Sequence, residues 1–218
     1  MPLTQPPRDC PLCPRLVAFR EEAQRLYPDW HNNPVPYWGD EKATLIIIGL
    51  APGLKGANRT GRPFTGDYAG DLLYATLKKV GLATGEYKQT PSDGLELHKT
   101  LIANAVACVP PQNKPTPAEQ KTCRQFLTRR LDEQKPRAYL ALGRIAHDSL
   151  LTVLGEKKSA HPFGHGAEHD LSGGARLFDS YHCSRYNTNT GVLTTEMFED
   201  VVGRAAAYVS RPSLSAIS

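Results

Sequence analysis

The sequence predicts an α/β fold in which a mainly parallel sheet is covered by helices on both faces. Short β-branched and aliphatic runs alternate along the chain with segments whose apolar residues recur at helical spacing. The first aliphatic run leads into a long glycine-rich loop, residues 49–67, and a helical segment follows that loop. Strands that alternate with helices usually form parallel sheets, because each helix carries the chain back across the sheet.

The first part of the chain contains one predicted strand and two predicted helices. Residues 1–9 are rich in proline and are predicted to be a loose tail, and an amphipathic helix is predicted over 15–26, after Pro14. The run at 43–48 contains three consecutive isoleucines and is typical of a strand buried on both faces. Helical spacing over 68–80 predicts the helix that follows the glycine-rich loop.

The rest of the chain repeats the same two patterns. Thr116 and Glu119 have the spacing of a capping box, with Pro117 at the first helical position, so a helix is predicted to begin there. The stretch 159–174 is rich in histidine and glycine and is predicted to be a loop. The remaining strands are predicted at 100–107, 137–143 and 175–181, and the remaining helices at 116–134, 145–154 and 195–209.

The composition is that of one globular domain spanning residues 1–218, with loose tails at 1–9 and 211–218. Hydrophobic residues make up 40% of the chain and charged residues 22%. A net charge of +4 is compatible with nucleic-acid binding but does not establish it. No apolar run approaches the ~18 residues of a membrane span, and the N-terminus lacks the apolar core of a signal peptide. We therefore expect a cytoplasmic protein with no membrane contact.

Three polar loops each follow a predicted strand. They span residues 49–67, 108–115 and 182–191. Ligands of open α/β sheets bind at the carboxyl ends of the strands, so these loops are expected to meet at one edge of the sheet. The first loop carries several cations and glycines, which suits the binding of a polyanion.

Four of the five cysteines form two pairs that suggest a metal site. Cys10 and Cys13 have C-x-x-C spacing among prolines, and Cys108 and Cys123 lie on either side of a proline-rich loop. A disulfide framework is not expected in a reducing compartment. Four thiolates suit either tetrahedral zinc or a four-iron cluster, and the alternative is a set of unrelated buried thiols. Cys183 has no C-x-x-C companion and is left outside this site.

Five stretches of the chain resemble motifs of the uracil-DNA glycosylases: residues 49–53, 58–67, 108–117, 159–163 and 180–191. The resemblance is to the type B branch of family five, whose members carry a four-iron–four-sulfur (4Fe-4S) cluster, and it covers about residues 10–202. It implies a three-layer α/β/α sandwich around a four-stranded parallel sheet. It also implies a structural cluster, with no catalytic metal, held by Cys10, Cys13, Cys108 and Cys123.

An enzyme that acts on a base of duplex DNA has to flip that base into a pocket. Phe64 is the expected stacking platform, and its alternative role is to pack the loop onto the following helix. Asn104 is expected to bind the amide edge of a pyrimidine, because an asparagine offers both a donor and an acceptor. Asn113 either shares this task or forms a turn, and Gly53 allows close approach of the backbone.

Two residues are expected to serve the reaction itself. In many other glycosylases of the superfamily an acidic or amide residue follows the opening glycine of the first motif, where this chain has Leu50 and Ala51. The group that handles water must then lie elsewhere, and Asp67 is the candidate, with Asp71 in reserve; a helix cap is the competing role of Asp67. His182 is expected to donate a hydrogen bond to the departing base, and its alternative is a rim histidine bonded to backbone.

Six residues on the three loops are expected to contact the DNA backbone: Lys55, Asn58, Arg59, Arg62, Lys114 and Arg185. Arg185 and Tyr186 also suit a wedge that enters the space left by the flipped base. No lysine lies where a Schiff base would need it, so simple base removal to an abasic site is expected. The expected partner is DNA that contains uracil or another deaminated base, bound by a monomer. The alternative is a nucleic-acid binding module without catalysis, stabilised by a cysteine-bound metal.

Overall fold

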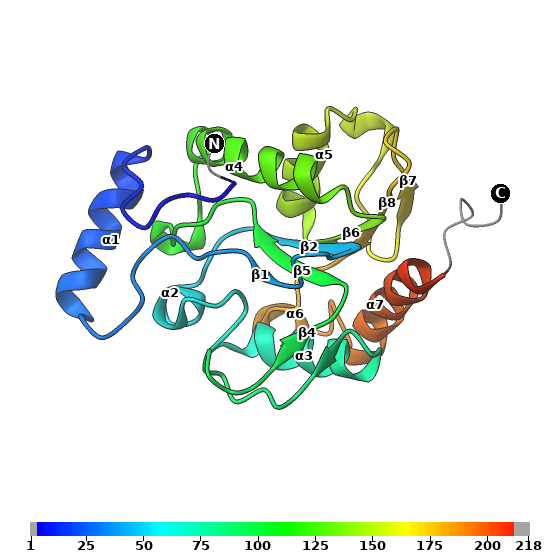
Figure 1. Cartoon of the computed structure of the whole chain (residues 1–218), viewed down its shortest axis with the longest axis horizontal. Coiled ribbons are helices and arrows are strands. Elements are labelled where there is room, and N and C mark those ends of the chain that lie inside the picture. Colours follow the sequence, from blue (N-terminus) through cyan, green and yellow to red (C-terminus); the bar gives the residue numbers. More distant parts are fainter. Residues whose placement is uncertain (1–3, 212–218) are drawn as a thin grey trace.

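A mixed six-stranded sheet runs through the middle of the molecule (Figure 1). The structure is a computed structural model that describes residues 4–211, so the outer parts of the two predicted tails, 1–3 and 212–218, lie outside it. The strands follow the order β1-β5-β2-β6-β8-β7 across the sheet. Their bounds are β1 Trp38–Gly39, β2 Leu45–Gly49, β5 Thr100–Asn104, β6 Ala138–Leu142, β7 Glu168–Asp170 and β8 Arg176–Ser180.

The four central strands are the predicted ones, and they are parallel to one another. The expectation of a four-stranded sheet is corrected by two edge strands, because β1 pairs with β5 and β7 pairs with β8, both antiparallel. These edge strands are only two and three residues long, too short for a recognisable alternation of apolar and polar residues. A separate hairpin of β3 (Ala83–Thr84) and β4 (Glu96–Leu97) was also not predicted.

The predicted helices are all present, and two short helices are added within predicted loops. The predicted capping box is confirmed at the start of α4, where Thr116 Oγ1 accepts from the Glu119 backbone N–H and the Glu119 carboxylate accepts from that of Thr116. The additions are α2 and α6. The bounds are α1 Pro14–Leu26, α2 Ala57–Thr60, α3 Tyr68–Lys79, α4 Pro117–Gln134, α5 Arg144–Leu154, α6 Arg185–Asn189 and α7 Thr195–Ser210.

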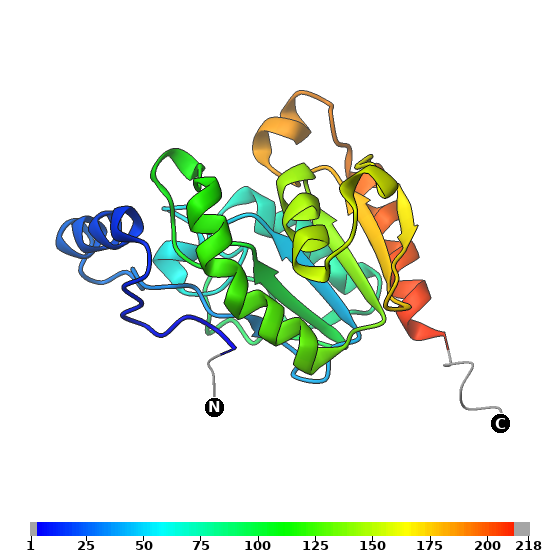
Figure 2. The same ribbon diagram turned by 90° about the horizontal axis from the view of Figure 1, so that it is seen from above.

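The helices cover both faces of the sheet, which confirms the three layers. Along β2 the side chains of Ile46 and Ile47 point to opposite faces, and both are fully buried. Ile47 belongs to the apolar core formed with α3 and α7, whereas Ile46 belongs to the core formed with α4 and α5. Figure 2 shows α4 and α5 on one side of the strands and α7 on the other. Within residues 4–211 there is no helix with the length and apolarity needed to cross a bilayer.

The strand order places a crevice beside β2. From β2 the chain passes through α3 to β5 on one side, and it then returns through α4 to β6 on the other side of β2. Neighbouring loops therefore diverge at the carboxyl end of β2, and ligands of open α/β sheets bind at such points. The loops that follow β2, β5 and β8 surround this position.

Candidate active site

A pocket of about 340 Å³ lies at the carboxyl ends of β2, β5 and β8. The predicted meeting of three loops at one edge of the sheet is confirmed, because each loop contributes to this pocket. Among its lining residues are all six that the sequence assigned to base binding and catalysis. The pocket is lined by Leu50, Ala51, Pro52, Gly53, Ala57, Phe64, Asp67, Ala69, Asn104, Asn113, His182 and Ser184.

The ring of Phe64 forms one wall of the pocket. Its centroid lies 6.0 Å from that of the His182 ring, with 31° between the two planes. Gly49, at the end of β2, leaves room for this ring, since a Cβ on Gly49 would lie 2.9 Å from Phe64 Cζ. The backbone of Phe64 has a φ of +50°, in the left-handed region that non-glycine residues rarely adopt. The loop therefore presents the ring through an uncommon backbone conformation.

The amide of Asn104 faces the same space from the last position of β5. In the parallel register Asn104 lies opposite Gly49, and a Cβ on Gly49 would lie 2.4 Å from Asn104 Oδ1. The residue is 7% exposed, and within the described part of the chain its side chain has no hydrogen-bond partner. A buried amide normally has partners, so this one is available to a ligand. Asn113, on the short turn Pro111–Asn113, lines the pocket from an exposed position.

Asp67 is both a helix cap and a pocket residue. Its Oδ1 accepts from the backbone N–H of Gly70 at 3.2 Å and caps α3. Its other oxygen faces the glycine-rich loop, where a Cβ on Gly56 would lie 2.4 Å from Oδ2. Burial raises the pKa of the Asp67 carboxyl above its ordinary value. Asp71, the reserve candidate, is exposed, accepts a hydrogen bond from Gln89 and does not line the pocket.

His182 follows β8 and lies opposite Phe64. Its backbone carbonyl accepts a hydrogen bond from Asn187 Nδ2 at 2.8 Å, which ties His182 to α6. Burial lowers the pKa of the His182 imidazole. The nearby Asp67 carboxylate acts to raise this pKa, but its effect is smaller. The ring is therefore neutral near pH 7, and it has no hydrogen-bond partner within residues 4–211. One ring N–H is thus free to point at a ligand in the pocket.

The helix α6 and its cap were missed by sequence reasoning, which treated 182–191 as a loop. Ser184 is the N-cap of α6, since its hydroxyl accepts from the Asn187 backbone N–H at 3.3 Å. Serine is among the preferred N-cap residues, a signal that could have been recognised. Ser184 also lines the pocket, and its place two residues after His182 is the only other indication in the sequence.

Four of the predicted DNA contacts are exposed around the pocket: Lys55, Arg59, Lys114 and Arg185. Arg59 Nε donates to the Lys55 backbone carbonyl at 2.9 Å, which ties the Arg59 side chain to the loop beside Lys55. The guanidinium of Arg185 lies 5.6 Å from the centroid of the Tyr68 ring. Tyr186 is 74% exposed beside it. Their contact with DNA stays a prediction, and their positions permit it.

Two of the predicted DNA contacts are buried, contrary to expectation. The Arg62 side chain is 2% exposed and forms an ion pair with Asp93, whose side chain is fully buried. Asn58 is 1% exposed, and its Nδ2 donates to Asn32 Oδ1 at 2.8 Å. Neither side chain can reach a phosphate in this structure. Both hold the glycine-rich loop to distant parts of the chain instead.

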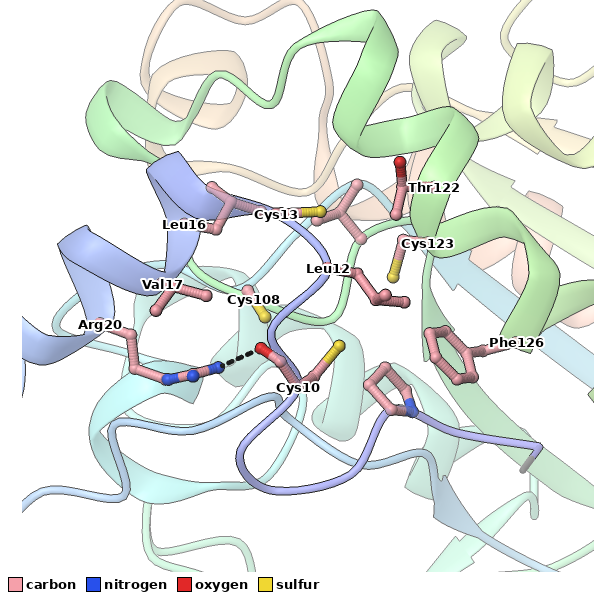
Figure 3. Close-up of a pocket in the computed structure, with 12 residues that line it drawn as sticks. Cys10, Leu12, Cys13, Leu16, Val17, Arg20, Cys108, Thr122, Cys123 and Phe126 are labelled. Carbon is pink, nitrogen blue, oxygen red and sulfur yellow. Dashed lines mark hydrogen bonds between the residues drawn. The ribbon is translucent and has the colours of Figure 1, made fainter. Parts of the chain in front are cut away.

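The four paired cysteines line one small pocket, as Figure 3 shows. Cys10 and Cys13 come from the segment before and at the start of α1, and Cys108 and Cys123 come from the loop after β5 and from α4. The backbone N–H of Ala107 donates to Cys123 Sγ at 3.4 Å. The remaining lining residues are Pro6, Leu12, Leu16, Val17, Arg20, Val106, Thr122 and Phe126. An apolar pocket lined by four cysteines suits a zinc ion or an iron–sulfur cluster, both of which bind four thiolates.

Burial favours the neutral form of these thiols. Burial, followed by the proximity of Cys123, raises the pKa of Cys108 to about 12. Burial raises that of Cys123 to about 11. Without a cation the thiols would stay neutral, whereas metal binding stabilises thiolates. Among the described residues, no three of the four sulfurs lie within 4.8 Å of one another.

Comparisons with known proteins agree with the resemblance seen in the sequence. The family model of the uracil DNA glycosylase superfamily matches residues 36–205. The chain is 49% identical over 203 residues to a type-5 uracil-DNA glycosylase of Thermus thermophilus, with 90% of this chain and 92% of the relative covered. It is 42% identical to a type-5 uracil-DNA glycosylase of Pyrobaculum aerophilum, with coverages of 91% and 88%. A type-4 uracil-DNA glycosylase of Sulfurisphaera tokodaii is 29% identical, with coverages of 79% and 74%.

Proposed function

Because this chain belongs to the uracil-DNA glycosylase superfamily and is similar to its type-5 members, we propose that it flips uracil out of DNA and hydrolyses the N-glycosidic bond. The product is an abasic site. The observation that carries the proposal is the unpartnered amide of Asn104, which faces the same pocket as the rings of Phe64 and His182. A pocket of about 340 Å³ is large enough for a pyrimidine.

Base recognition follows from the two side chains that flank Gly49. The Phe64 ring provides a surface for stacking, and the Asn104 amide pairs with the donor and acceptor on the edge of uracil. Cytosine carries an amino group where uracil has a carbonyl, so a fixed amide orientation would distinguish the two bases. Asn113 and Gly53 complete the lining at the mouth of the pocket.

Bond cleavage follows from His182 and Asp67. As the bond between the sugar C1′ and the base nitrogen breaks, its electron pair passes to the base, and the sugar becomes positively charged. The free N–H of His182 stabilises the anionic oxygen of the base. The Asp67 carboxylate stabilises the cationic sugar or orients the water whose oxygen bonds to C1′. The proton that this water loses balances the charge of the released base.

The rate should depend on the protonation of Asp67. Because burial raises the pKa of this carboxyl, the catalytically useful anion is lost at a higher pH than for an ordinary aspartate. We expect single-turnover rates, measured from about pH 4 to about pH 8, to fall on the acid side of the range. Asp67→Asn should lower the rate and remove this dependence. A wild-type rate that stays constant down to the ordinary pKa of aspartate would contradict the role of Asp67.

The exposed cations around the pocket are proposed to bind the DNA backbone, with Arg185 and Tyr186 entering the space left by the base. Among the described residues that line the pocket, none is a lysine. This supports base removal without a Schiff base and without strand cleavage. We further propose that the protein acts as a monomer.

Cys10, Cys13, Cys108 and Cys123 are proposed to hold a 4Fe-4S cluster. Around a single zinc ion the four sulfurs would lie only about 3.8 Å apart, from the tetrahedral geometry and the Zn–S bond length. Among the described residues, no three of the four sulfurs lie within 4.8 Å of one another, so they are not gathered as around a single zinc ion, and the choice of a 4Fe-4S cluster rests on the resemblance to the type B branch of family five. When bound, the cluster supplies no chemistry to the base pocket. It would tie the start of α1 to α4 and to the loop after β5, which carries Asn113.

Cluster binding can be tested on the purified protein. We expect about four irons and a similar amount of acid-labile sulfide per chain. Cys123→Ser should lose most of this iron and lower the melting temperature, because the thiolate ligand is removed. Cys183→Ser is the matched control, since Cys183 is a more deeply buried cysteine that lies elsewhere and donates to the Ala69 carbonyl. Zinc without iron in the anaerobically purified protein would contradict the cluster.

The proposed activity is tested by incubating the protein with a duplex that contains one uracil and then treating it with alkali, which cleaves abasic sites. Strand scission only after alkali supports a glycosylase without lyase activity. Binding of the duplex without any abasic product would favour the alternative of a non-catalytic binding module. A panel of other deaminated bases in the same duplex would then define the range of substrates.

A further inference from the structure

The segment 85–95 joins β3 to β4 and packs against the loop that carries Phe64. It contributes no lining residue to the pocket. Its Tyr87 hydroxyl donates to the Phe64 carbonyl at 3.2 Å and accepts from the Gly66 backbone N–H at 3.3 Å. Burial raises the pKa of Tyr87 to about 12, so this hydroxyl keeps its proton. One side chain thus bridges the two sides of the turn that follows Phe64.

The backbone of Phe64 needs support of this kind. A non-glycine residue with a φ of +50° lies in a sparsely populated backbone region and persists only where the surrounding structure holds it. Two consecutive carbonyls of this turn accept hydrogen bonds from tyrosines. The buried Tyr74 donates its hydroxyl to the Pro63 carbonyl at 2.5 Å, and the partly buried Tyr87 donates to the Phe64 carbonyl. The rings of Tyr74 and Tyr87 lie 4.7 Å apart. The left-handed conformation is therefore held by contacts behind the Phe64 ring.

Gly70 on α3 makes room for this arrangement. A Cβ at this position would lie 1.8 Å from the Phe64 carbonyl oxygen and 2.4 Å from the Tyr87 hydroxyl. Its φ is not in the left-handed region, so backbone freedom does not explain the glycine. Glycine inside a helix lowers helix stability. The glycine at position 70 is explained here by the Phe64 carbonyl and the Tyr87 hydroxyl, which lie too close to leave room for a Cβ.

The segment 85–95 is anchored to the glycine-rich loop by the buried ion pair between its Asp93 and Arg62 of that loop. Arg62 donates to both carboxylate oxygens of Asp93, at 2.8 and 2.7 Å. The same carboxylate accepts from the backbone N–H groups of Lys88 and Leu95, which closes the segment on itself. The Arg62 guanidinium lies 5.6 Å from the centroid of the Tyr87 ring. Asp93 thereby fixes the position of Tyr87 relative to the loop.

We propose that Tyr87 is a positioning residue for base recognition, acting through the backbone of Phe64 to aim its ring at the flipped base. This inference rests on the proposed function. It assigns to a segment outside the glycosylase motifs a role in the geometry of the base pocket. Tyr87 does not touch the base, and its effect must therefore disappear when the Phe64 ring is absent.

A double-mutant cycle tests this dependence. Tyr87→Phe removes one hydroxyl and its two partly buried hydrogen bonds but keeps the ring, so we expect kcat/KM for a uracil duplex to fall about tenfold. Inhibition by free uracil should weaken by a similar factor. In a Phe64→Ala background the same change should alter kcat/KM less than about twofold, since coupled residues are not additive.

Lys88→Ala is the control on the same segment, because its exposed ammonium pairs with the exposed Glu86. This variant should match the wild type. All rates are measured well below the melting temperature of the least stable variant. If Tyr87→Phe leaves kcat/KM unchanged, or if its tenfold effect persists in the Phe64→Ala background, the inference is overturned. If the wild type releases no uracil, the proposed function fails instead, so the two failures are distinguishable.

Discussion

Replacement of His182 by alanine is expected to slow uracil excision by about 10²–10³-fold, the usual cost of removing one donor from a site that stabilises a developing anion. The His182 ring lies opposite Phe64 and has a free N–H, and burial lowers its pKa so that it is neutral near pH 7. Single-turnover rates on a uracil duplex measure the effect. Binding of abasic DNA should change little, because the ring acts on the leaving base and not on phosphates.

Two further variants test whether the hydrogen-bond donor of His182 is what the reaction needs. His182→Gln keeps an N–H donor of comparable reach, so it should recover part of the lost rate. His98→Ala removes an exposed histidine next to β4, whose ring bonds to Thr84 and does not line the pocket, and it should keep the wild-type rate. If His182→Ala excised uracil at a rate within a few-fold of the wild type, the anion would have to be stabilised by another group.

Replacement of Asp93 by alanine is expected to lower the free energy of unfolding by about 3–5 kcal/mol, the typical cost of breaking a buried ion pair. The change leaves the Arg62 guanidinium buried and unpaired. Burial opposes ionisation of Asp93, but hydrogen bonds from Arg62 and two backbone N–H groups outweigh it and hold the pKa below its usual range. The pair therefore stabilises the fold at neutral pH and loses this contribution as the pH falls towards the lowered pKa.

Urea unfolding at pH 7 provides the measurement, read as a shift of the midpoint at constant slope. Lys79→Ala is the matched control, since the Lys79 side chain is 64% exposed in its pair with Glu199 and such pairs contribute at most about 1 kcal/mol. The double variant Arg62→Met, Asp93→Leu should be less destabilised than Asp93→Ala, because it leaves no unpaired charge. Equal midpoints for Asp93→Ala and Lys79→Ala would show that Arg62 does not depend on its partner.

Most of the fold could be predicted from the sequence because its elements are long and locally encoded. The strand β2 is a run of aliphatic residues buried on both faces, and α4 begins with a capping box that the structure reproduces. The elements that were missed are short. In β1 and β7 the pairing is decided by the neighbouring strand, and α2 and α6 have only four and five residues, too few for a helical period.

Most of the candidate site could be located from the order of the strands and loops in the sequence. Parallel strands end at the same edge of the sheet, so the loops that follow β2, β5 and β8 had to lie close together. This brought Phe64, Asn104 and His182 into one pocket, as expected. The choice between Asp67 and Asp71 was not available from the sequence, because it depends on which carboxylate faces the pocket and which bonds to Gln89.

The amino-acid pattern alone determined the layered architecture, the edge of the sheet where the pocket lies and the two cysteine pairs, since these depend on local periodicity and on loop order. Only the tertiary structure decided what the charged and polar side chains of the glycine-rich loop do. Arg62 looks like a phosphate ligand in the sequence, yet it pairs with Asp93, 31 residues further along the chain. Burial and partner choice arise from contacts between distant segments, and no local pattern encodes them.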